Sequence, residues 1–197
     1  MPRKPVSDKE TIISAAVEIV RTQGYSALNA RALASRLGCS TQPIFSNFRS
    51  MEELTQGVLM RILEIYNGFV ENVLESGRYE TPYKANGMAY IRFAMEEPNL
   101  FSLLFMRDRR DGKTSVEEST FNDILPLIMK TTGLTQEQAT LFHLEMWTVV
   151  HGIASMAATG YLSLDESLAS EVLTDAYQGL IHRFRTKYNP DSHGDLK

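Results

Sequence analysis

The amino-acid sequence predicts an all-α protein, in which a small N-terminal helical domain is joined to a larger C-terminal one. Apolar residues recur at spacings of three and four along almost all of the 197 residues, as they do on one face of a helix. Capping residues and glycines bracket the apolar stretches. No stretch shows the alternation of apolar and polar residues that indicates a strand.

The first 50 residues predict three short helices, over about residues 8–23, 30–37 and 41–47. Ser7 and Glu10 have the spacing of a capping box, whereas Asn29 and Ser40 are the expected caps of the second and third helices. Glycines end the first two helices. Pro43 falls in the first turn of the third helix, where its missing N–H would have no intrahelical partner.

Beyond residue 50 the pattern predicts a larger domain of longer helices, over 51–188, followed by a disordered tail over 189–197. The expected helices span about 51–76, 82–97, 99–106, 116–130, 135–159 and 163–187. Capping boxes open three of them, with Ser50 and Glu53, Thr135 and Gln138, and Ser163 and Glu166. Asn99 is the expected cap of the short apolar helix, and Pro126 is expected to kink or split its helix.

Composition excludes several classes of protein. A single cysteine, Cys39, cannot form an internal disulfide, and we interpret it as a small core residue rather than a redox sensor. No signal peptide is apparent, and the longest uncharged stretch, 146–164, is too polar for a membrane span. We therefore expect a cytoplasmic protein. Dinucleotide, P-loop, zinc-protease and hydrolase motifs are absent, so we expect neither an enzyme nor a cofactor.

Charge is distributed unevenly along the chain. Residues 1–50 carry seven basic and three acidic residues, a net charge of +4, whereas residues 51–197 carry 13 basic and 21 acidic, a net charge of −8. A basic N-terminal end on an acidic body indicates a polyanion-binding surface. Chance clustering of surface charge is the alternative.

Two short helices joined by a glycine turn match the helix-turn-helix pattern. The second of them carries Thr41, Gln42, Ser46 and Asn47, which are polar but uncharged. Glutamine and asparagine can form paired hydrogen bonds with adenine in the major groove, whereas a solvated helix more often carries lysine and glutamate. The composition favours base reading, although the same geometry occurs in bundles that bind no DNA.

Residues 12–59 resemble the DNA-binding domain of TetR-family transcriptional regulators. The resemblance lies in an alanine-rich first helix that ends at Gly24-Tyr25, in the turn Leu33-Ala34 to Gly38-Cys39-Ser40, and in the recognition helix Ile44-Phe45-Ser46-Asn47-Phe48. It implies contacts to operator DNA by the following residues: Asn29, Arg31, Ser40, Thr41, Gln42, Pro43, Phe45, Asn47, Arg49 and Met51. Phe45 and Met51 replace the tyrosine and lysine that are usual in the family, and each replacement removes a polar backbone contact.

The resemblance also implies a dimer and an effector site in the larger domain. Small residues in the 135–159 helix and apolar residues in the last helix suggest a helix–helix interface, formed by Gly152, Ala154, Ser155, Ala157, Ala158, Leu168, Val172, Ala176, Gly179 and Leu180. An ordinary intrachain core is the alternative. A pocket for an apolar or aromatic molecule would be lined by Phe69, Tyr90, Phe93, Phe105, Met106, Met129, Phe142 and Trp147, which equally suit a plain core.

His143 and His151 lie two turns apart on one helix face. No cysteine or carboxylate stands at a spacing that would complete a metal site, so we expect no metal and interpret each histidine as a core group with one hydrogen bond. Taken together, the sequence predicts a homodimeric DNA-binding regulator that represses at a pseudo-palindromic operator and is released by a small ligand. The alternative is a helical interaction module that has lost specific DNA binding.

Overall fold

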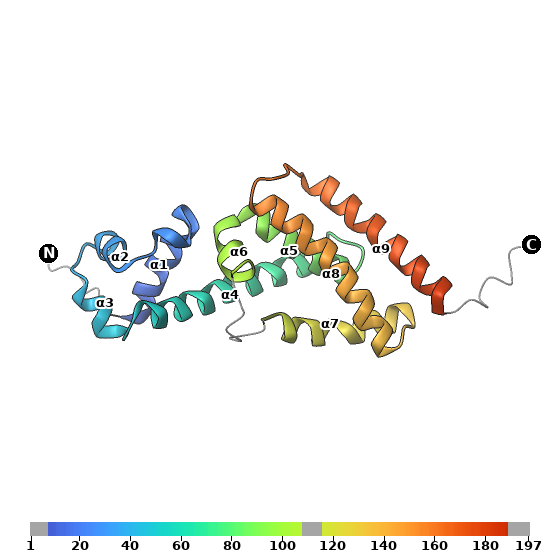
Figure 1. The fold of residues 1–197 in the computed structure, drawn as a ribbon, viewed down its shortest axis with the longest axis horizontal. Helices are drawn as coiled ribbons and strands as arrows, with labels where there is room; N and C mark the ends of the chain where they lie inside the picture. The colour runs from blue at the N-terminus through green and yellow to red at the C-terminus, as the bar shows by residue number, and fades with distance from the viewer. Residues whose placement is uncertain (1–7, 108–115, 189–197) are drawn as a thin grey trace, which may run out of the picture. The chain divides into compact units, whose positions relative to one another are not determined.

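The computed structural model describes residues 8–107 and 116–188, including the side chains of 8–107 and 124–188, and within these ranges it contains helices and no strands (Figure 1). The elements are α1 (Lys9–Gln23), a 3₁₀ turn η1 (Tyr25–Ala27), α2 (Ala30–Leu37), α3 (Gln42–Asn47), α4 (Met51–Glu75), α5 (Pro82–Glu96), α6 (Pro98–Phe105), α7 (Val116–Thr132), α8 (Gln136–Ala158) and α9 (Glu166–Tyr188). The all-α prediction is confirmed. The tail predicted to be disordered lies outside the described residues.

Contacts divide the chain into two compact units, and neither is continuous in sequence. Unit 1 consists of Met1–Asn72 and Phe93–Arg107, and unit 2 consists of Val73–Arg92 and Asp108–Lys197. Both α4 and α5 therefore begin in one unit and end in the other. The predicted division into a helix-turn-helix domain over 1–50 and a helical regulatory and dimerisation domain over 51–188 stays a prediction.

Unit 1 is built around α1, whose apolar face is buried as its spacing predicts. The core of the unit includes Ile12, Ala16, Val17, Val20, Leu33, Ala34, Ile44, Leu54 and Val58. The short helix α6, far away in sequence, also packs on α1. Arg21 donates from Nε to Glu97 at 3.0 Å, and Asn99 donates from its side-chain amide to the carbonyl oxygen of Arg21 at 2.9 Å.

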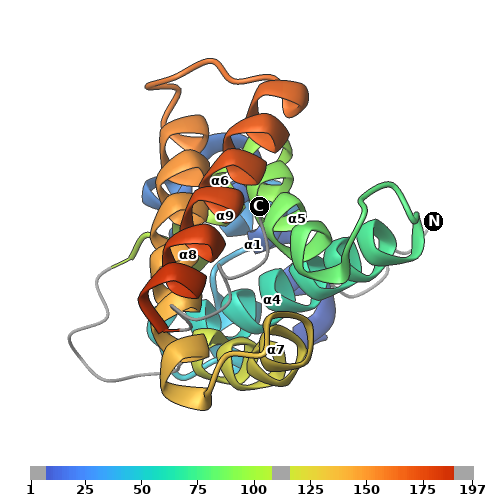
Figure 2. The ribbon, with the colours of Figure 1, turned by 90° about the vertical axis from the view of Figure 1, so that its right-hand side faces the viewer.

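Unit 2 contains α7, α8 and α9, with most of α5. Figures 1 and 2 both show α8 and α9 running side by side in opposite directions. Phe142 of α8 and Phe184 of α9 are buried and meet edge to face, with ring centroids 5.4 Å apart. The close approach of α5 requires Gly87, because a Cβ atom there would lie 3.1 Å from the side chain of Leu173.

Several helices begin at a different residue from the one predicted. Asp8 caps α1 through the N–H of Thr11, while Ser7 lies outside the described residues. Asp165 accepts from the N–H of Leu168 at the start of α9, so the cap lies two residues later than the predicted Ser163. In both places a serine and an aspartate compete for the cap, and the aspartate takes it.

Two other caps were also predicted wrongly. Thr41, not Ser40, occupies the N-cap position of α3, and its side chain makes no capping bond. Asn99 lies inside α6, because Pro98 already provides a first helical residue that needs no partner for an N–H. Pro126 lies within α7 without splitting it.

Candidate nucleic-acid interface

The turn between α2 and α3 is fixed by local hydrogen bonds. The side-chain oxygen of Asn29 accepts from the N–H groups of Arg31 and Ala32, at 3.1 and 3.0 Å, as its predicted capping role requires. Gly38 adopts a left-handed φ of 67°, and the N–H of Cys39 donates back to the carbonyl oxygen of Ala34. The chain leaves α2 in the conformation that favours glycine and enters α3 four residues later.

Buried apolar side chains hold α2 and α3 within unit 1. Leu33 of α2 and Ile44 of α3 are fully buried, and Phe48, directly after α3, is nearly so. Because these residues face inward, Gln42, Phe45 and Ser46 face solvent. The resulting arrangement is a helix-turn-helix whose second helix presents polar and aromatic side chains.

Most polar side chains of α3 are engaged by their own helix. The hydroxyl of Ser46 donates to the carbonyl oxygen of Gln42 at 2.9 Å, and the amide of Asn47 donates to that of Pro43 at 2.9 Å. Within the described residues, the side chain of Gln42 makes no hydrogen bond. Gln42 is therefore the polar group of α3 that is most available to an external partner.

The basic residues of unit 1 differ in what they contact. Lys9, Arg21 and Arg61 form ion pairs with carboxylates of the same unit. Arg31 and Arg49 are exposed, and among the residues that the structure describes neither forms an ion pair. These two guanidinium groups, at either side of the turn and α3, are available to an anion.

The start of α4 lies next to this surface. Ser50 accepts from the N–H of Glu53 at 3.2 Å, as in a capping box, but the carboxylate of Glu53 accepts from the N–H of Arg49 at 2.7 Å rather than from that of Ser50. This backbone hydrogen bond lowers the pKa of Glu53 below its ordinary value. The carboxylate thus fixes the backbone at Arg49.

All ten residues of the predicted DNA contact set lie in unit 1. Six are exposed: Asn29, Arg31, Ser40, Gln42, Phe45 and Arg49. Four are half-buried: Thr41, Pro43, Asn47 and Met51. Their assignment to DNA contacts stays a prediction.

The residues of the predicted effector pocket are divided between the two units. Phe69, Phe93, Phe105 and Met106 belong to unit 1, whereas Tyr90, Met129, Phe142 and Trp147 belong to unit 2. In unit 1, Tyr66, which sequence reasoning missed, packs edge to face on Phe93 and Phe105 at centroid distances of 5.2 and 5.1 Å. Met106 and Met129 are exposed.

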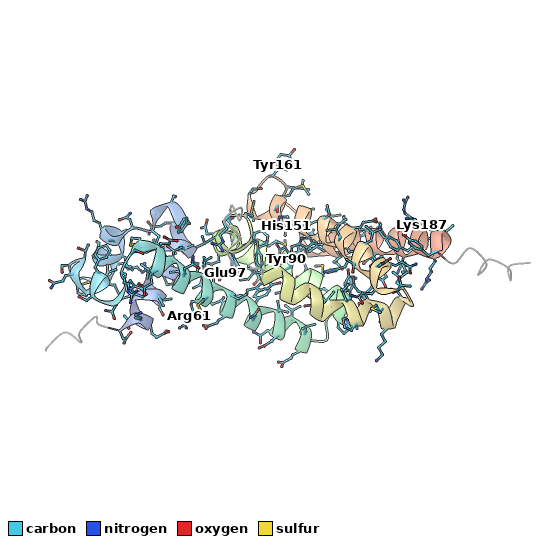
Figure 3. The ribbon with its side chains drawn as sticks, turned by 60° about the horizontal axis from the view of Figure 1, so that its bottom comes forward. Arg61, Tyr90, Glu97, His151, Tyr161 and Lys187 are labelled. Atoms are coloured by element: carbon cyan, nitrogen blue, oxygen red, sulfur yellow. The ribbon has the colours of Figure 1, made fainter. Side chains whose placement is uncertain are left out.

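Unit 2 contains two tyrosine–histidine pairs between α5 and α8. The Tyr83 hydroxyl lies 3.1 Å from Nδ1 of His143. The Tyr90 hydroxyl lies 2.9 Å from Nδ1 of His151, and Figure 3 labels these two residues. Burial lowers the pKa of His143 to about 4, so this imidazole is neutral at neutral pH. Trp147 stacks on His151, with centroids 5.6 Å apart. The sequence predicted both histidines as core groups but not their partners, although Tyr83 and Tyr90 lie two turns apart on one face of α5.

The predicted dimer residues differ in burial. Leu168 and Val172 of α9 are 45% and 40% exposed, and Gly179 on the same face is exposed too. Ala154 is fully buried within its own chain. The others are half-buried: Gly152, Ser155, Ala157, Ala158, Ala176 and Leu180.

No group of three or more potential metal ligands occurs among the described residues. Within the same part of the chain, no helix combines the length and the apolarity that crossing a membrane requires.

Two family models match the chain. Residues 12–58 match the model described as bacterial regulatory proteins, tetR family, and residues 83–178 match the tetracyclin repressor-like C-terminal domain. The first match covers α2, α3 and the turn between them. The second covers both tyrosine–histidine pairs and the first half of α9.

Individual proteins are also similar. An uncharacterized HTH-type transcriptional regulator of Mycobacterium tuberculosis is 24% identical over 169 residues, which are 85% of this chain and 77% of that protein. The crystal structure of a TetR-like transcriptional regulator from Rhodococcus sp. RHA1 has a TM-score of 0.66 at 15% identity, over 90% of this chain and 98% of its own. A TetR family protein of Vibrio parahaemolyticus has a TM-score of 0.60 at 15% identity, over 87% and 97%.

Proposed function

The chain belongs to the tetR family of bacterial regulatory proteins, which are transcriptional regulators rather than enzymes, and from this premise we propose how it acts. It is a homodimeric repressor that binds a pseudo-palindromic operator through α2 and α3. A small apolar or aromatic molecule, bound in the helical domain, releases it from DNA. The observation that carries the proposal is the outward face of α3 and its flanks, where the side chains of Gln42, Arg31 and Arg49 are exposed and make no hydrogen bond to the described residues.

This surface supports DNA binding because it combines two kinds of contact. Arg31 and Arg49 are positioned to neutralise phosphates, which supplies affinity without sequence choice. Gln42 can pair with the N6 and N7 atoms of adenine in the major groove. A two-fold dimer would place its half-sites about one helical turn apart or slightly more.

Glycine positions support pairing through α8 and α9. Gly57 and Gly87 are explained by the chain's own packing, since a Cβ at either would lie within about 3 Å of an apolar side chain. At Gly152 and Gly179, which are also helical, a Cβ would meet nothing within 4 Å. A helical glycine costs about 0.5–1 kcal/mol relative to alanine. Gly68 of α4 is equally open, but Gly179 shares its face of α9 with the exposed Leu168 and Val172, and this combination favours close approach by another helix. A second copy of the chain would supply that helix.

The path of α5 supports release by a ligand. The helix begins in unit 2, among the tyrosine–histidine pairs, and ends in unit 1, where α6 follows and is bonded to Arg21 of α1. A molecule that displaces α5 would therefore move a helix end bonded to the DNA-binding unit. The bound molecule would thereby favour dimers in which the distance between the two α3 helices does not match the operator.

The test of DNA binding begins with selection of duplexes from a random library by the full chain. We expect an enriched pseudo-palindrome. Gln42→Ala should weaken binding to it by about 1–3 kcal/mol and leave scrambled DNA almost unaffected. Arg49→Ala should weaken both duplexes alike and reduce the slope of log affinity against log salt by about one. Equal losses on both duplexes for Gln42→Ala would remove Gln42 from the reading surface, and absence of any enriched sequence would favour the interaction-module alternative.

The dimer is tested by Val172→Glu, which places a charge on the outward face of α9. Sedimentation should show a dimer for the wild type and a monomer for the variant, because the interface would bury an unpaired carboxylate. Met60→Glu is the matched control, since Met60 is 68% exposed on α4 of unit 1. A wild type that is monomeric at micromolar concentration contradicts the proposal.

Release is tested with compounds found by their effect on the melting temperature. A compound that weakens operator binding by some factor must itself bind the operator complex more weakly by the same factor. A compound that binds within unit 2 but leaves operator affinity unchanged contradicts the release mechanism.

A further inference from the structure

We propose that Phe45 reads the 5-methyl group of thymine, so that an apolar contact takes part in the choice of operator. The inference rests on the proposed function, because it requires α3 to enter the major groove. It names a specificity-determining residue at that surface and the chemical group that this residue recognises.

The position of Phe45 is unusual for a phenyl ring. Phe45 is 49% exposed, whereas Ile44 before it is fully buried and Phe48 after it is 4% exposed. The core of unit 1 therefore uses its neighbours and leaves this ring in solvent. Burying an aromatic ring is favourable because its apolar surface leaves water, and an exposed ring does not gain this free energy. A partner that covered the ring would supply it.

The chemistry of the ring restricts that partner. A phenyl group has no hydrogen-bond donor or acceptor, so it cannot form the hydrogen bond to a phosphate that a tyrosine at this position would form. The 5-methyl of thymine is the apolar group that a base pair of ordinary DNA presents in the major groove. Contact with that methyl is thus the sequence-dependent interaction that the ring can make.

The neighbouring polar groups strengthen this assignment. The hydroxyl of Ser46 and the amide of Asn47 already donate to carbonyl oxygens of α3. Gln42 lies three residues before Phe45, and residues at this spacing share a face of a helix. The face that α3 offers to DNA thus consists mainly of one amide and one phenyl ring. We expect it to select half-sites that contain thymine beside Phe45.

The experiment uses the full-length dimer and the operator selected above, with thymines replaced one at a time by deoxyuridine. The replacement removes the methyl group and changes no hydrogen-bonding atom. Burial of one methyl corresponds to about a fourfold change in affinity. We expect one position in each half-site to show this loss, and about a 15-fold loss when both are replaced.

Protein variants identify the reader of the methyl group. Phe45→Ala should bind the thymine and uracil duplexes equally at that position, and Phe45→Leu should keep a partial preference for thymine. Gln42→Ala is the matched control, and it should bind more weakly yet retain the full preference. Melting temperatures close to that of the wild type show that each variant folds, as the exposure of both residues leads us to expect.

Two outcomes overturn the inference while DNA binding stands. In one, the wild type binds the operator but does not distinguish uracil from thymine at any position, as a ring packed on the sugar–phosphate backbone would behave. In the other, Phe45→Ala keeps the preference, so that another residue reads the methyl. Failure of the wild type to select any operator is a different result, which overturns the proposed function itself.

Discussion

Both units contain charged pairs, which in unit 2 join Glu166 of α9 to Arg78 and to Arg92 of α5, but only in unit 2 do tyrosine–histidine pairs connect helices among the described residues. In unit 1 charged pairs join helices at the surface: Lys9 with Glu53 at 3.5 Å, Arg21 with Glu97 at 3.0 Å, and Arg61 with Glu10 (Figure 3). In unit 2 tyrosine–histidine pairs, which are partly or fully buried, join α5 to α8. Both kinds of contact link helices that are distant in sequence.

The two kinds of contact should weaken under different solution conditions. Exposed ion pairs contribute little because water and salt screen them, whereas a buried polar group that loses its partner retains its cost of desolvation. Salt should therefore act on the charged pairs, such as those of unit 1, and acid on the buried His143 of unit 2.

Acid should produce the largest effect. The imidazole of His143 has an ordinary pKa of 6.5 in the unfolded chain, and burial lowers it to about 4 in the folded one. The unfolded state therefore binds the proton more readily, so stability is complete above pH 6.5 and falls as the pH drops towards 4. This difference in pKa corresponds to about 3 kcal/mol in the free energy of unfolding.

Urea titrations between pH 7 and pH 4 measure this loss. His143→Gln should remove most of the pH dependence that arises above pH 4, whereas His182→Gln, at an exposed position, should retain it. If His143→Gln lost stability with pH as steeply as the wild type, the histidine would not be the source.

Loss of one buried hydroxyl should have an intermediate effect. Tyr90→Phe removes the hydrogen bond to His151 and leaves the imidazole without that partner, which should lower the free energy of unfolding by about 1–2 kcal/mol. Tyr161→Phe is the matched control, because Tyr161 is 82% exposed and points away from the helices (Figure 3). Equal free energies of unfolding for the two variants would show that the Tyr90–His151 hydrogen bond does not stabilise the fold.

Breaking a surface pair should have the smallest effect. Glu10→Gln removes the charge that pairs with Arg61 and should cost about 0.5 kcal/mol in low salt. Urea is the appropriate denaturant, because guanidinium itself screens charge. The cost should vanish in about 1 M NaCl, where the screening length is roughly 3 Å, while that of Tyr90→Phe should persist. If Glu10→Gln still lowered the free energy of unfolding in high salt, the expected difference between charged pairs and tyrosine–histidine pairs would be wrong.

The sequence predicted the start of a helix correctly where only one suitable capping residue was nearby. Asn29 caps α2, and Thr135 with Gln138 forms the capping box of α8. Where two suitable side chains lay close together, as with Ser163 and Asp165, local rules could not choose between them. The choice depends on where packing lets the helix begin, which a short window of sequence does not contain.

Contacts between helices that are distant in sequence were harder to predict than helix ends. No local pattern in the sequence indicated that α6 would pack on α1, where Asn99 donates to the carbonyl oxygen of Arg21. The sequence identified His143 and His151 as core groups but not the tyrosines opposite them. The helix-turn-helix was readily predicted, apart from the cap of α3, because Asn29, Gly38 and the buried side chains lie within 20 residues of one another.

The stacking of Trp147 on His151 has a photophysical consequence. The chain contains one tryptophan, which lies in unit 2 with its ring 4.8 Å from that of Tyr90 and 5.6 Å from that of His151. Indole emission therefore originates in a single unit, beside His151 of the same helix and Tyr90 of α5. We expect this emission to change when α5 separates from α8, so the protein carries an intrinsic fluorescent reporter of that contact.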